Sequence, residues 1–217
     1  MPRESKAHKS DRAREIVARL EKAMPEAKIA LDYTNELELL VAVMLSAQCT
    51  DKLVNTVTPA LFARHPSAAA YARSSPRELE NYIKRVGLFR NKAKNLHACM
   101  TILAERGGSL PRTREALNEL PGVGWKTAGV VANHAFGTPA FPVDTHVGRV
   151  ARRLGLTRQE DPDKVEAELT RLLPEESWGR GHQLFIWHGR KTCDAKRPRC
   201  EGCAVNDLCP SAGRFAA

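Results

Sequence analysis

A lysine and an aspartate 18 residues apart are the pair best suited to chemistry in this chain. Lys126 follows the segment Pro-Gly-Val-Gly-Trp, and Asp144 begins the segment Asp-Thr-His. A neutral lysine amine can attack the C1′ carbon of a sugar, and a nearby carboxylate can stabilise the positive charge that develops there. The plainer roles are a phosphate-binding or solvated lysine and an aspartate that caps a helix. Taken alone, Lys126 is better explained as a phosphate-binding or solvated lysine. Asp144 downstream is what favours a catalytic role for Lys126.

Two glycines precede this lysine, in the segment Leu120-Pro121-Gly122-Val123-Gly124 between two predicted helices. Glycines one residue apart permit a tight turn whose backbone N–H groups stay exposed. Those donors, beside the N-terminus of the next helix, form a site for a phosphate oxygen that needs no charged side chain. The same turn also serves as an ordinary connector between helices, so it indicates phosphate binding only in combination with other features.

Four cysteines near the C-terminus lie within 17 residues at the spacing C-x6-C-x2-C-x5-C, namely Cys193, Cys200, Cys203 and Cys209. Four thiolates in one short segment can hold a zinc ion or an iron–sulfur cluster, and their spacing alone does not separate the two. A disulfide framework is disfavoured because the polar N-terminus predicts no export signal. Cys49 and Cys99 stand alone among apolar residues, and we expect both to be buried free thiols.

The loop between the first two of these cysteines is basic. It contains Lys196, Arg197 and Arg199 against the single acidic residue Asp194. Held at both ends by cysteine ligands, it would form a stiff basic projection that suits backbone phosphates. The whole chain has the same bias, with 34 lysines and arginines against 25 acidic residues and a net charge of +9. This charge favours a polyanionic partner, of which nucleic acid is the commonest, over a basic surface without a partner.

The composition is that of a folded protein without membrane segments. Of the 217 residues, 42% are hydrophobic and 27% charged, which excludes a largely disordered or coiled-coil chain. The longest run without an acidic or basic residue covers 17 residues, 127–143, and is interrupted by glycine and proline. A membrane-spanning helix needs about 20 apolar residues. We therefore expect a cytoplasmic protein that makes no membrane contact.

Helical periodicity runs through most of the chain, and no alternating run of β-branched residues predicts a strand. Residues 1–12 are polar and expected to be mobile, and the first helix is predicted from apolar positions between Ala13 and Met24. Residues 37–45 are apolar nearly all round, which predicts a buried central helix. The remaining predicted helices begin near Ser75 (with a capping box to Glu78, and ending at Gly87), Asn91, Thr113, Thr127, Asp144, Asp161 and Ser177.

Taken together, these segments resemble the endonuclease III family of helix-hairpin-helix DNA glycosylases. The resemblance rests on the hairpin with its lysine, the Val-Asp-Thr-His segment and the cysteine tail. Further matching segments are Leu45-Ser46-Ala47-Gln48, residues 86–93 and residues 184–190. The motifs follow the family's order and spacing from about residue 12 to Pro210, so the resemblance covers almost the whole chain.

The resemblance implies an all-α fold with two helical lobes and a DNA-binding cleft between them. Residues 29–138 would form a six-helix domain that carries the hairpin. Residues 1–28 and 139–217 would form the second domain, in which the four cysteines hold one 4Fe–4S cluster with a structural role. We expect the tail after Lys191 to depend on its metal for order, because it has few apolar residues to bury.

The resemblance also implies an enzyme of base excision repair that removes oxidised or damaged pyrimidines from double-stranded DNA and cleaves abasic sites. Lys126 would form a Schiff base with C1′, with help from Asp144, and β-elimination would then cut the strand. Gln48 and Leu88 would fill the gap left by the flipped base, unless they are a helix-terminal amide and a core residue. Further DNA contacts or lesion-pocket roles would fall to Asp51, Gly122, Gly124, His146, Lys196, Arg197 and Arg199.

Three rival functions differ in what they require of these residues. A glycosylase without lyase activity would not need Lys126, and a non-catalytic DNA-binding protein would need neither Lys126 nor Asp144. An electron carrier would need neither the hairpin nor the charge of +9. For His146, a structural hydrogen bond is favoured over proton transfer. Trp125, where the family often has a basic residue, and Cys49 depart from the family pattern near the cleft. We expect a monomer associated with the nucleoid.

Overall fold

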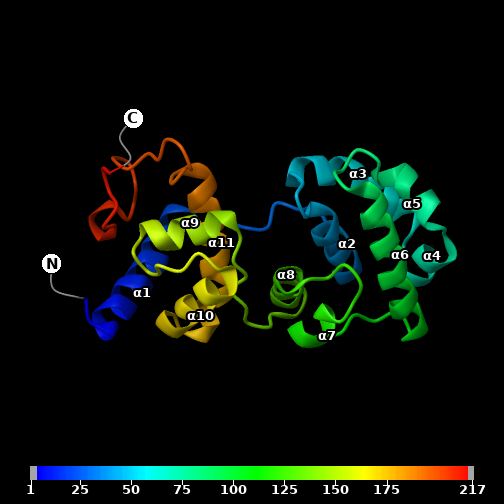
Figure 1. The fold of residues 1–217 in the computed structure, drawn as a ribbon, viewed down its shortest axis with the longest axis horizontal. Coiled ribbons are helices and arrows are strands. Elements are labelled where there is room, and N and C mark those ends of the chain that lie inside the picture. The colour runs from blue at the N-terminus through cyan, green and yellow to red at the C-terminus, as the bar shows by residue number, and fades with distance from the viewer. Residues whose placement is uncertain (1–3, 215–217) are drawn as a thin grey trace. The chain divides into compact units, whose positions relative to one another are not determined.

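The computed structural model describes residues 4–214, and within that range every regular element is a helix (Figure 1). The predicted all-α class is therefore confirmed. The chain divides into two compact units. The central unit is the continuous segment Ala30–Thr138, and the split unit combines the described residues up to Ile29 with those from Pro139 onward. None of the helices described is long and apolar enough to cross a membrane.

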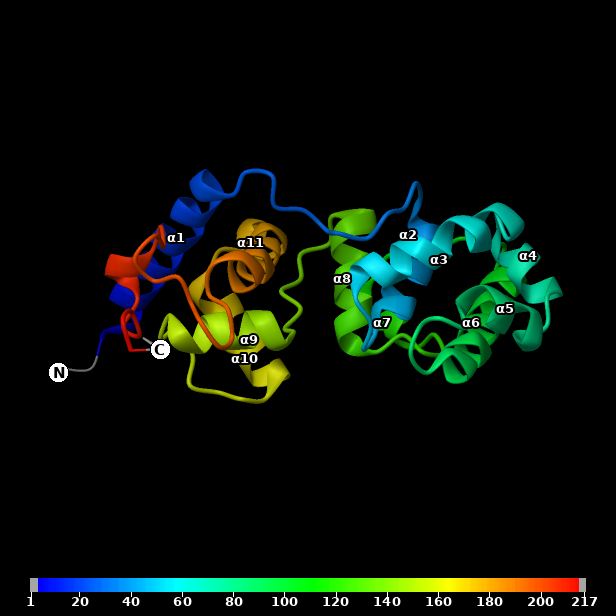
Figure 2. The ribbon, with the colours of Figure 1, turned by 90° about the horizontal axis from the view of Figure 1, so that it is seen from above.

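The central unit is built around α2 (Glu36–Ser46), in which the side chains of all residues from Leu39 to Leu45 are buried. This helix packs against α3, α6 and α8, as expected for a helix that is apolar nearly all round. The long helix α6 also packs against α4 and α5, which lie beside it in both views (Figures 1 and 2). The other helices of this unit are α3 (Asp51–Arg64), α4 (Ala68–Arg73), α5 (Pro76–Ile83), α6 (Phe89–Glu105), α7 (Arg114–Asn118) and α8 (Trp125–Phe136).

Local capping explains where several of these helices begin. At α5, the Ser75 side chain accepts a hydrogen bond from the Glu78 N–H while the Glu78 carboxylate accepts one from the Ser75 N–H, so the predicted capping box is confirmed. The prediction that Gly87 ends this helix is wrong, because α5 already ends at Ile83 and Leu88, not Gly87, takes the left-handed conformation. No helix was predicted over residues 51–73, where α3 and α4 lie.

The split unit has its own hydrophobic core. Its helices are α1 (Lys6–Ala23), α9 (Thr145–Arg153), α10 (Pro162–Leu172) and α11 (Trp178–Lys191), with short 3-10 turns at Glu175–Ser177 and Asn206–Leu208. The central helix is α11, which packs against α1 and α9 (Figure 2). Phe141 and Phe185 meet edge to face at 5.6 Å in the core, and Val205 of the cysteine tail is fully buried there.

The prediction of a mobile N-terminus is wrong from Lys6 onward, where α1 begins; residues 1–3 lie outside the described part. The Ser5 hydroxyl oxygen caps the helix by accepting from the His8 N–H at 3.2 Å. Arg12 donates to the Glu4 carboxylate at 2.8 and 2.9 Å and to the carbonyl oxygen of Leu154 at 2.6 Å. Polar contacts therefore hold the first turns of this helix, and apolar periodicity could not show them.

Candidate active site and cysteine pocket

The two glycines form the predicted tight turn between α7 and α8. Gly122 has φ 76°, and a Cβ atom at this position would lie 2.7 Å from the Cβ of Asn95, so both the conformation and the space require glycine. Gly124 is the N-cap of α8 and offers no side chain to the helix. The first N–H groups of α8 have no acceptors within the helix, which makes this turn suited to an anion.

Lys126 is the second residue of α8, and its side chain is exposed at this turn. Its neighbour Trp125 is 40% exposed although it is a large aromatic residue. The indole is held from one side by Arg114 of α7, whose guanidinium lies over the ring. The structure thus places an amine and an anchored aromatic ring on the first turn of α8, next to the hairpin glycines.

Gln48 and Leu88 share a backbone feature that is rare outside glycine. Both adopt the left-handed conformation, with φ 54° and 57°, and they are the only such non-glycine residues in the described range. Holding a side-chain-bearing residue there costs about 1 kcal/mol or more, and the surroundings must enforce it. Leu88 is 61% exposed, so it is not a core residue. Gln48 is exposed as well and lies just beyond the end of α2.

An open pocket of about 490 Å³ lies between these two residues and the hairpin. Its lining comes from three segments that the sequence singled out, with Met44, Ala47 and Gln48 at the end of α2 and just beyond it, Leu88, Asn91, Lys92 and Asn95 around the start of α6, and Gly122 of the hairpin. Asp51, by contrast, does not line it; this residue opens α3, where Thr50 is the N-cap. We call this cavity the Gln48–Leu88 pocket.

Asp144 lies in the split unit as the N-cap of α9. Its Oδ1 atom accepts a hydrogen bond from the Val147 N–H at 2.8 Å, and the side chain is half-buried. His146 is one turn away from Arg149, whose guanidinium donates to His146 Nδ1 at 3.1 Å. This contact agrees with a structural hydrogen bond for His146. Of the two isolated cysteines, Cys99 is buried as expected, but Cys49 is only half-buried because it follows Gln48 in an exposed loop.

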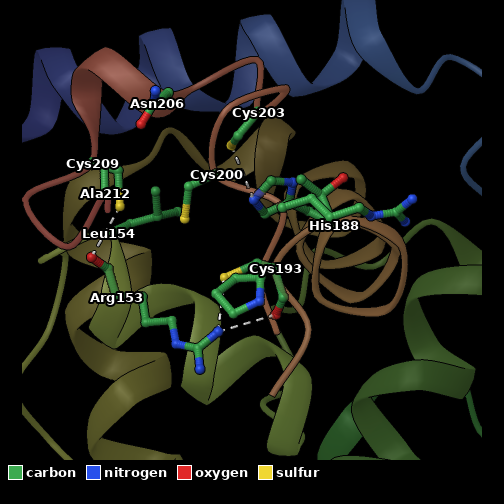
Figure 3. Close-up of a pocket in the computed structure, with 12 residues that line it drawn as sticks. Arg153, Leu154, His188, Cys193, Cys200, Cys203, Asn206, Cys209 and Ala212 are labelled. Atoms are coloured by element: carbon green, nitrogen blue, oxygen red, sulfur yellow. Dashed lines mark hydrogen bonds between the residues drawn. The ribbon is translucent and has the colours of Figure 1, made fainter. Parts of the chain in front are cut away.

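The four clustered cysteines line one open pocket of about 320 Å³ (Figure 3). Arg153 and His188 line it as well. The Arg153 guanidinium lies 3.4 Å from Cys193 Sγ, and His188 Nε2 lies 3.8 Å from Cys203 Sγ. Burial lowers the pKa of His188 to about 4 and raises the pKa of the Cys203 and Cys209 thiols. Across residues 4–214, no three histidine, cysteine or acidic side chains converge closely enough to bind a single metal ion.

The basic loop after Cys193 is folded onto α9 by hydrogen bonds. Asp194 Oδ1 accepts from the N–H groups of Lys196 at 2.9 Å and Arg197 at 3.2 Å, and these two bonds lower the pKa of the Asp194 carboxyl. Arg153 donates to the carbonyl oxygens of Asp194 at 2.6 Å and Ala195 at 2.8 Å. Lys196, Arg197 and Arg199 are exposed. The loop therefore has an ordered backbone from which basic side chains reach solvent.

Comparison with known proteins agrees with this architecture. Residues 41–175 match the family described as HhH-GPD superfamily base excision DNA repair protein. The chain is 49% identical over 208 residues to the endonuclease III of Synechocystis sp., with 95% of each chain covered. It is 41% identical to that of Escherichia coli K12, covering 90% of this chain and 93% of the relative. The chain belongs to the endonuclease III family.

Solved structures of similar proteins have the same fold as this chain. A trapped endonuclease III–DNA covalent intermediate with an estranged adenine superposes with a TM-score of 0.89 at 42% identity, covering 94% of this chain and 97% of the other. A thermostable thymine-DNA glycosylase, 21% identical, has a TM-score of 0.85 and shares the fold. Family membership confirms the predicted activity: a base excision repair DNA glycosylase with lyase activity, whose partner is DNA. The electron-carrier and non-catalytic alternatives are set aside.

Sequence reasoning missed two residues that shape this endonuclease III site. Lys92 donates from Nζ to the carbonyl oxygen of Leu45 at 2.8 Å, and burial lowers its pKa. Arg114 anchors Trp125, and it lies against α8 where Gly129 has no side chain. For Lys92 the available signal was its place in the matching segment 86–93; for Arg114 there was none, because its contact depends on how α7 packs on α8.

Proposed function

We propose that Lys126 is the nucleophile of this glycosylase and lyase. The observation that carries the proposal is its position on the first turn of α8, exposed, directly after the N–H groups that the Gly122–Gly124 turn leaves for a phosphate. A backbone phosphate bound at this turn would bring a neighbouring sugar to the amine, and such positioning accounts for a large part of many rate enhancements.

Lys126 would displace the base and then hold the sugar as a Schiff base. The amine nitrogen bonds to C1′, the C1′–N bond to the base breaks, and the base leaves with that electron pair and gains a proton. The sugar ring opens to give a Schiff base between Lys126 and C1′. Loss of a proton from C2′ then expels the 3′ phosphate oxygen, which cuts the strand, and water releases the enzyme. The alternative without Lys126 as nucleophile would release the base but leave the strand intact.

We assign to Asp144 the stabilisation of positive charge on the sugar and help with removing the proton from Lys126. The hydrogen bond from Val147 N–H to Oδ1 fixes the position of the carboxylate at the start of α9. Capping and catalysis are compatible in one side chain, because a carboxylate has a second oxygen for the sugar. For the domains we propose the boundaries that the resemblance implies, with residues 29–138 as one domain and residues 1–28 with 139–217 as the other.

We assign Gln48 and Leu88 to the gap that base flipping opens in the duplex. Leu88 is an exposed apolar side chain on a strained backbone, as expected for a wedge that replaces lost stacking. Asp51 and His146 are proposed to lie near the lesion, and Lys196, Arg197 and Arg199 to contact backbone phosphates. Such phosphate contacts would position the enzyme without reading sequence.

We propose that the four cysteines hold one 4Fe–4S cluster. The donor set fits: four thiols border a single pocket, at the spacing that the resemblance associates with a 4Fe–4S cluster. Arg153 and His188 supply N–H groups around the sulfurs, which stabilise the negative charge of thiolate ligands. When bound, the cluster would supply structural cross-links. It would thereby fix both ends of the loop that carries Lys196, Arg197 and Arg199, in addition to the hydrogen bonds that already order its backbone.

Borohydride trapping tests the reaction. The protein is mixed with a duplex that contains one thymine glycol, and the reductant converts a Schiff base into a permanent protein–DNA bond. We expect an adduct that disappears in Lys126→Ala and persists in Lys94→Ala, an exposed lysine of α6. Asp144→Asn tests the carboxylate sharply, because asparagine also caps helices. We expect it to slow adduct formation at least about a hundredfold.

The other outcomes separate the alternatives. Base release without an adduct or strand cut would establish a glycosylase without lyase activity. Trapping on an abasic-site duplex alone would retain Lys126 as nucleophile and change the assigned lesion. For the cluster, we expect a brown protein with about four iron atoms per chain, lost in Cys203→Ser. One zinc atom per colourless chain would contradict the 4Fe–4S assignment.

A further inference from the structure

We propose that Lys92 is a positioning residue that holds Gln48 and Leu88 in the conformations from which their side chains enter DNA. This inference rests on the proposed function of those two residues. Lys92 is half-buried in the wall of the Gln48–Leu88 pocket, in the first turn of α6. Its hydrogen bonds reach the end of α2, three residues before Gln48, and Leu88 itself.

The side chain of Lys92 fixes the loop of Gln48. Its Nζ donates to the carbonyl oxygen of Leu45, in the last turn of α2, at 2.8 Å. The last carbonyls of a helix have no partners within it, and a cation there also opposes the negative end of the helix dipole. Two neighbouring carbonyls are bound locally: Val43 O accepts from Ser46 Oγ at 2.9 Å, and Ser46 O from the Cys49 N–H at 3.0 Å. The bond from Lys92 ties this end of α2 to a different helix, α6.

The backbone of Lys92 fixes the loop of Leu88. Its N–H donates to the carbonyl oxygen of Leu88 at 3.0 Å, which is the first hydrogen bond of α6 and defines Leu88 as its N-cap. Leu88 makes no side-chain cap of its own. One residue therefore binds the peptide at the end of α2 through its ammonium group and the left-handed Leu88 through its main chain.

The two loops also approach each other directly. A Cβ atom on Gly87 would lie 3.8 Å from the carbonyl oxygen of Gln48, so the two backbones are neighbours. Left-handed residues other than glycine persist only where their surroundings over-determine them. Lys92 is the charged side chain that lines the pocket and is placed to do so, whereas Lys94, two residues further along α6, is exposed and does not line the pocket.

Substrates that differ in stacking test this role. In a duplex, the enzyme must open the stack and fill the gap; in a single-stranded oligonucleotide with an abasic site, there is no gap to fill. Lys92→Met keeps the length and apolar stem of the side chain but removes its charge and its donors. We expect it to slow single-turnover base removal from a thymine glycol duplex about tenfold, as for the loss of one charged hydrogen bond. Cleavage of the single strand should stay within about twofold of the unmodified protein, and Lys94→Met should change neither.

A thermodynamic cycle adds a readout that a general loss of stability would not move. In a Gln48→Ala/Leu88→Ala background, Lys92→Met should slow base removal from the duplex less than about twofold, because the two side chains that Lys92 positions are already absent. 2-Aminopurine opposite the lesion should report less unstacking with Lys92→Met than with Lys94→Met. Should Lys92→Met fail to fold, Lys92→Gln, which keeps an amide donor on a shorter chain, takes its place with the same expected dependence on substrate.

Equal losses on duplex and single strand would overturn the inference, since they would place Lys92 in the chemistry or in the general fold. An unchanged rate on both substrates, or full additivity in the Gln48→Ala/Leu88→Ala background, would overturn it as well. Failure of the proposed function would give a different result, because the unmodified protein itself would then form no Schiff base with either substrate.

Discussion

Arg114 lies over Trp125, with its guanidinium carbon 4.0 Å from the centre of the indole ring and its Nε donating to the Trp125 carbonyl oxygen at 3.0 Å. The first residue of α7 is thereby joined to the first residue of α8, across the turn that precedes Lys126. Gly129 makes room for this contact, because a Cβ atom there would lie 2.7 Å from Arg114 Nε. The hairpin is therefore closed by a side-chain clamp in addition to its glycine turn.

Removal of this clamp should lower the stability of the fold. We expect Arg114→Ala to lower the free energy of unfolding by about 1 to 2 kcal/mol, the combined worth of a partly exposed cation–π contact and one hydrogen bond. Urea unfolding measures this change, and Arg77→Ala, at an exposed position of α5, is the control. Gly129→Ala should act in the same direction by displacing Arg114. Equal stability of Arg114→Ala and Arg77→Ala would show that the clamp contributes nothing.

For the left-handed residues Gln48 and Leu88 we predict little change in stability. Gln48→Gly and Leu88→Gly relieve backbone strain of about 1 kcal/mol, while glycine adds a comparable entropy to the unfolded chain. We therefore expect stability within about 1 kcal/mol of the unmodified protein, together with slower base removal from a thymine glycol duplex. Thermal unfolding and single-turnover kinetics measure the two effects. A larger loss of stability would mean that these side chains serve packing and not the DNA.

Features that depend on nearby residues were predictable from sequence. The apolar run of α2, the capping box at Ser75 and the N-cap role of Asp144 all involve partners within one turn. The sequence did not predict α3, because this helix contains Pro59 and several β-branched residues, which lower helix propensity. The strained conformation of Leu88 was missed because the adjacent Gly87 was the expected place for a turn.

Contacts between distant segments were not predictable in the same way. The Lys92–Leu45 bond joins residues 47 positions apart, and no periodic pattern marks either of them. The cysteine cluster is the exception, since its four residues lie close together in the chain and their spacing alone indicated a shared site. Side-chain chemistry was therefore easier to assign than the packing that positions it.

The two isolated cysteines should differ in reactivity. Cys99 is fully buried, and burial raises the pKa of its thiol to about 12, whereas Cys49 is half-buried in the loop after α2. Because the thiolate is the reacting form, iodoacetamide at pH 8 should label Cys49 and leave Cys99 unmodified in the folded protein. Peptide mapping by mass spectrometry reads out both sites, and labelling in denaturant shows that Cys99 can react. Labelling of Cys99 at the rate of Cys49 would contradict its burial.

Acidification should destabilise the central unit through His134 of α8. Burial lowers the pKa of His134 from 6.5, so the folded protein keeps this ring neutral at a pH where the unfolded chain protonates it. The unfolded state then binds more protons, so the free energy of unfolding falls as the pH drops below about 6.5. The full loss is about 1.4 kcal/mol for each unit by which folding lowers the pKa of His134. His134→Gln removes this contribution, so its stability should fall less than that of the unmodified protein between pH 7.5 and pH 5.5. Urea unfolding at the two pH values measures the difference. Parallel losses in both proteins would show that His134 titrates alike in the folded and unfolded states.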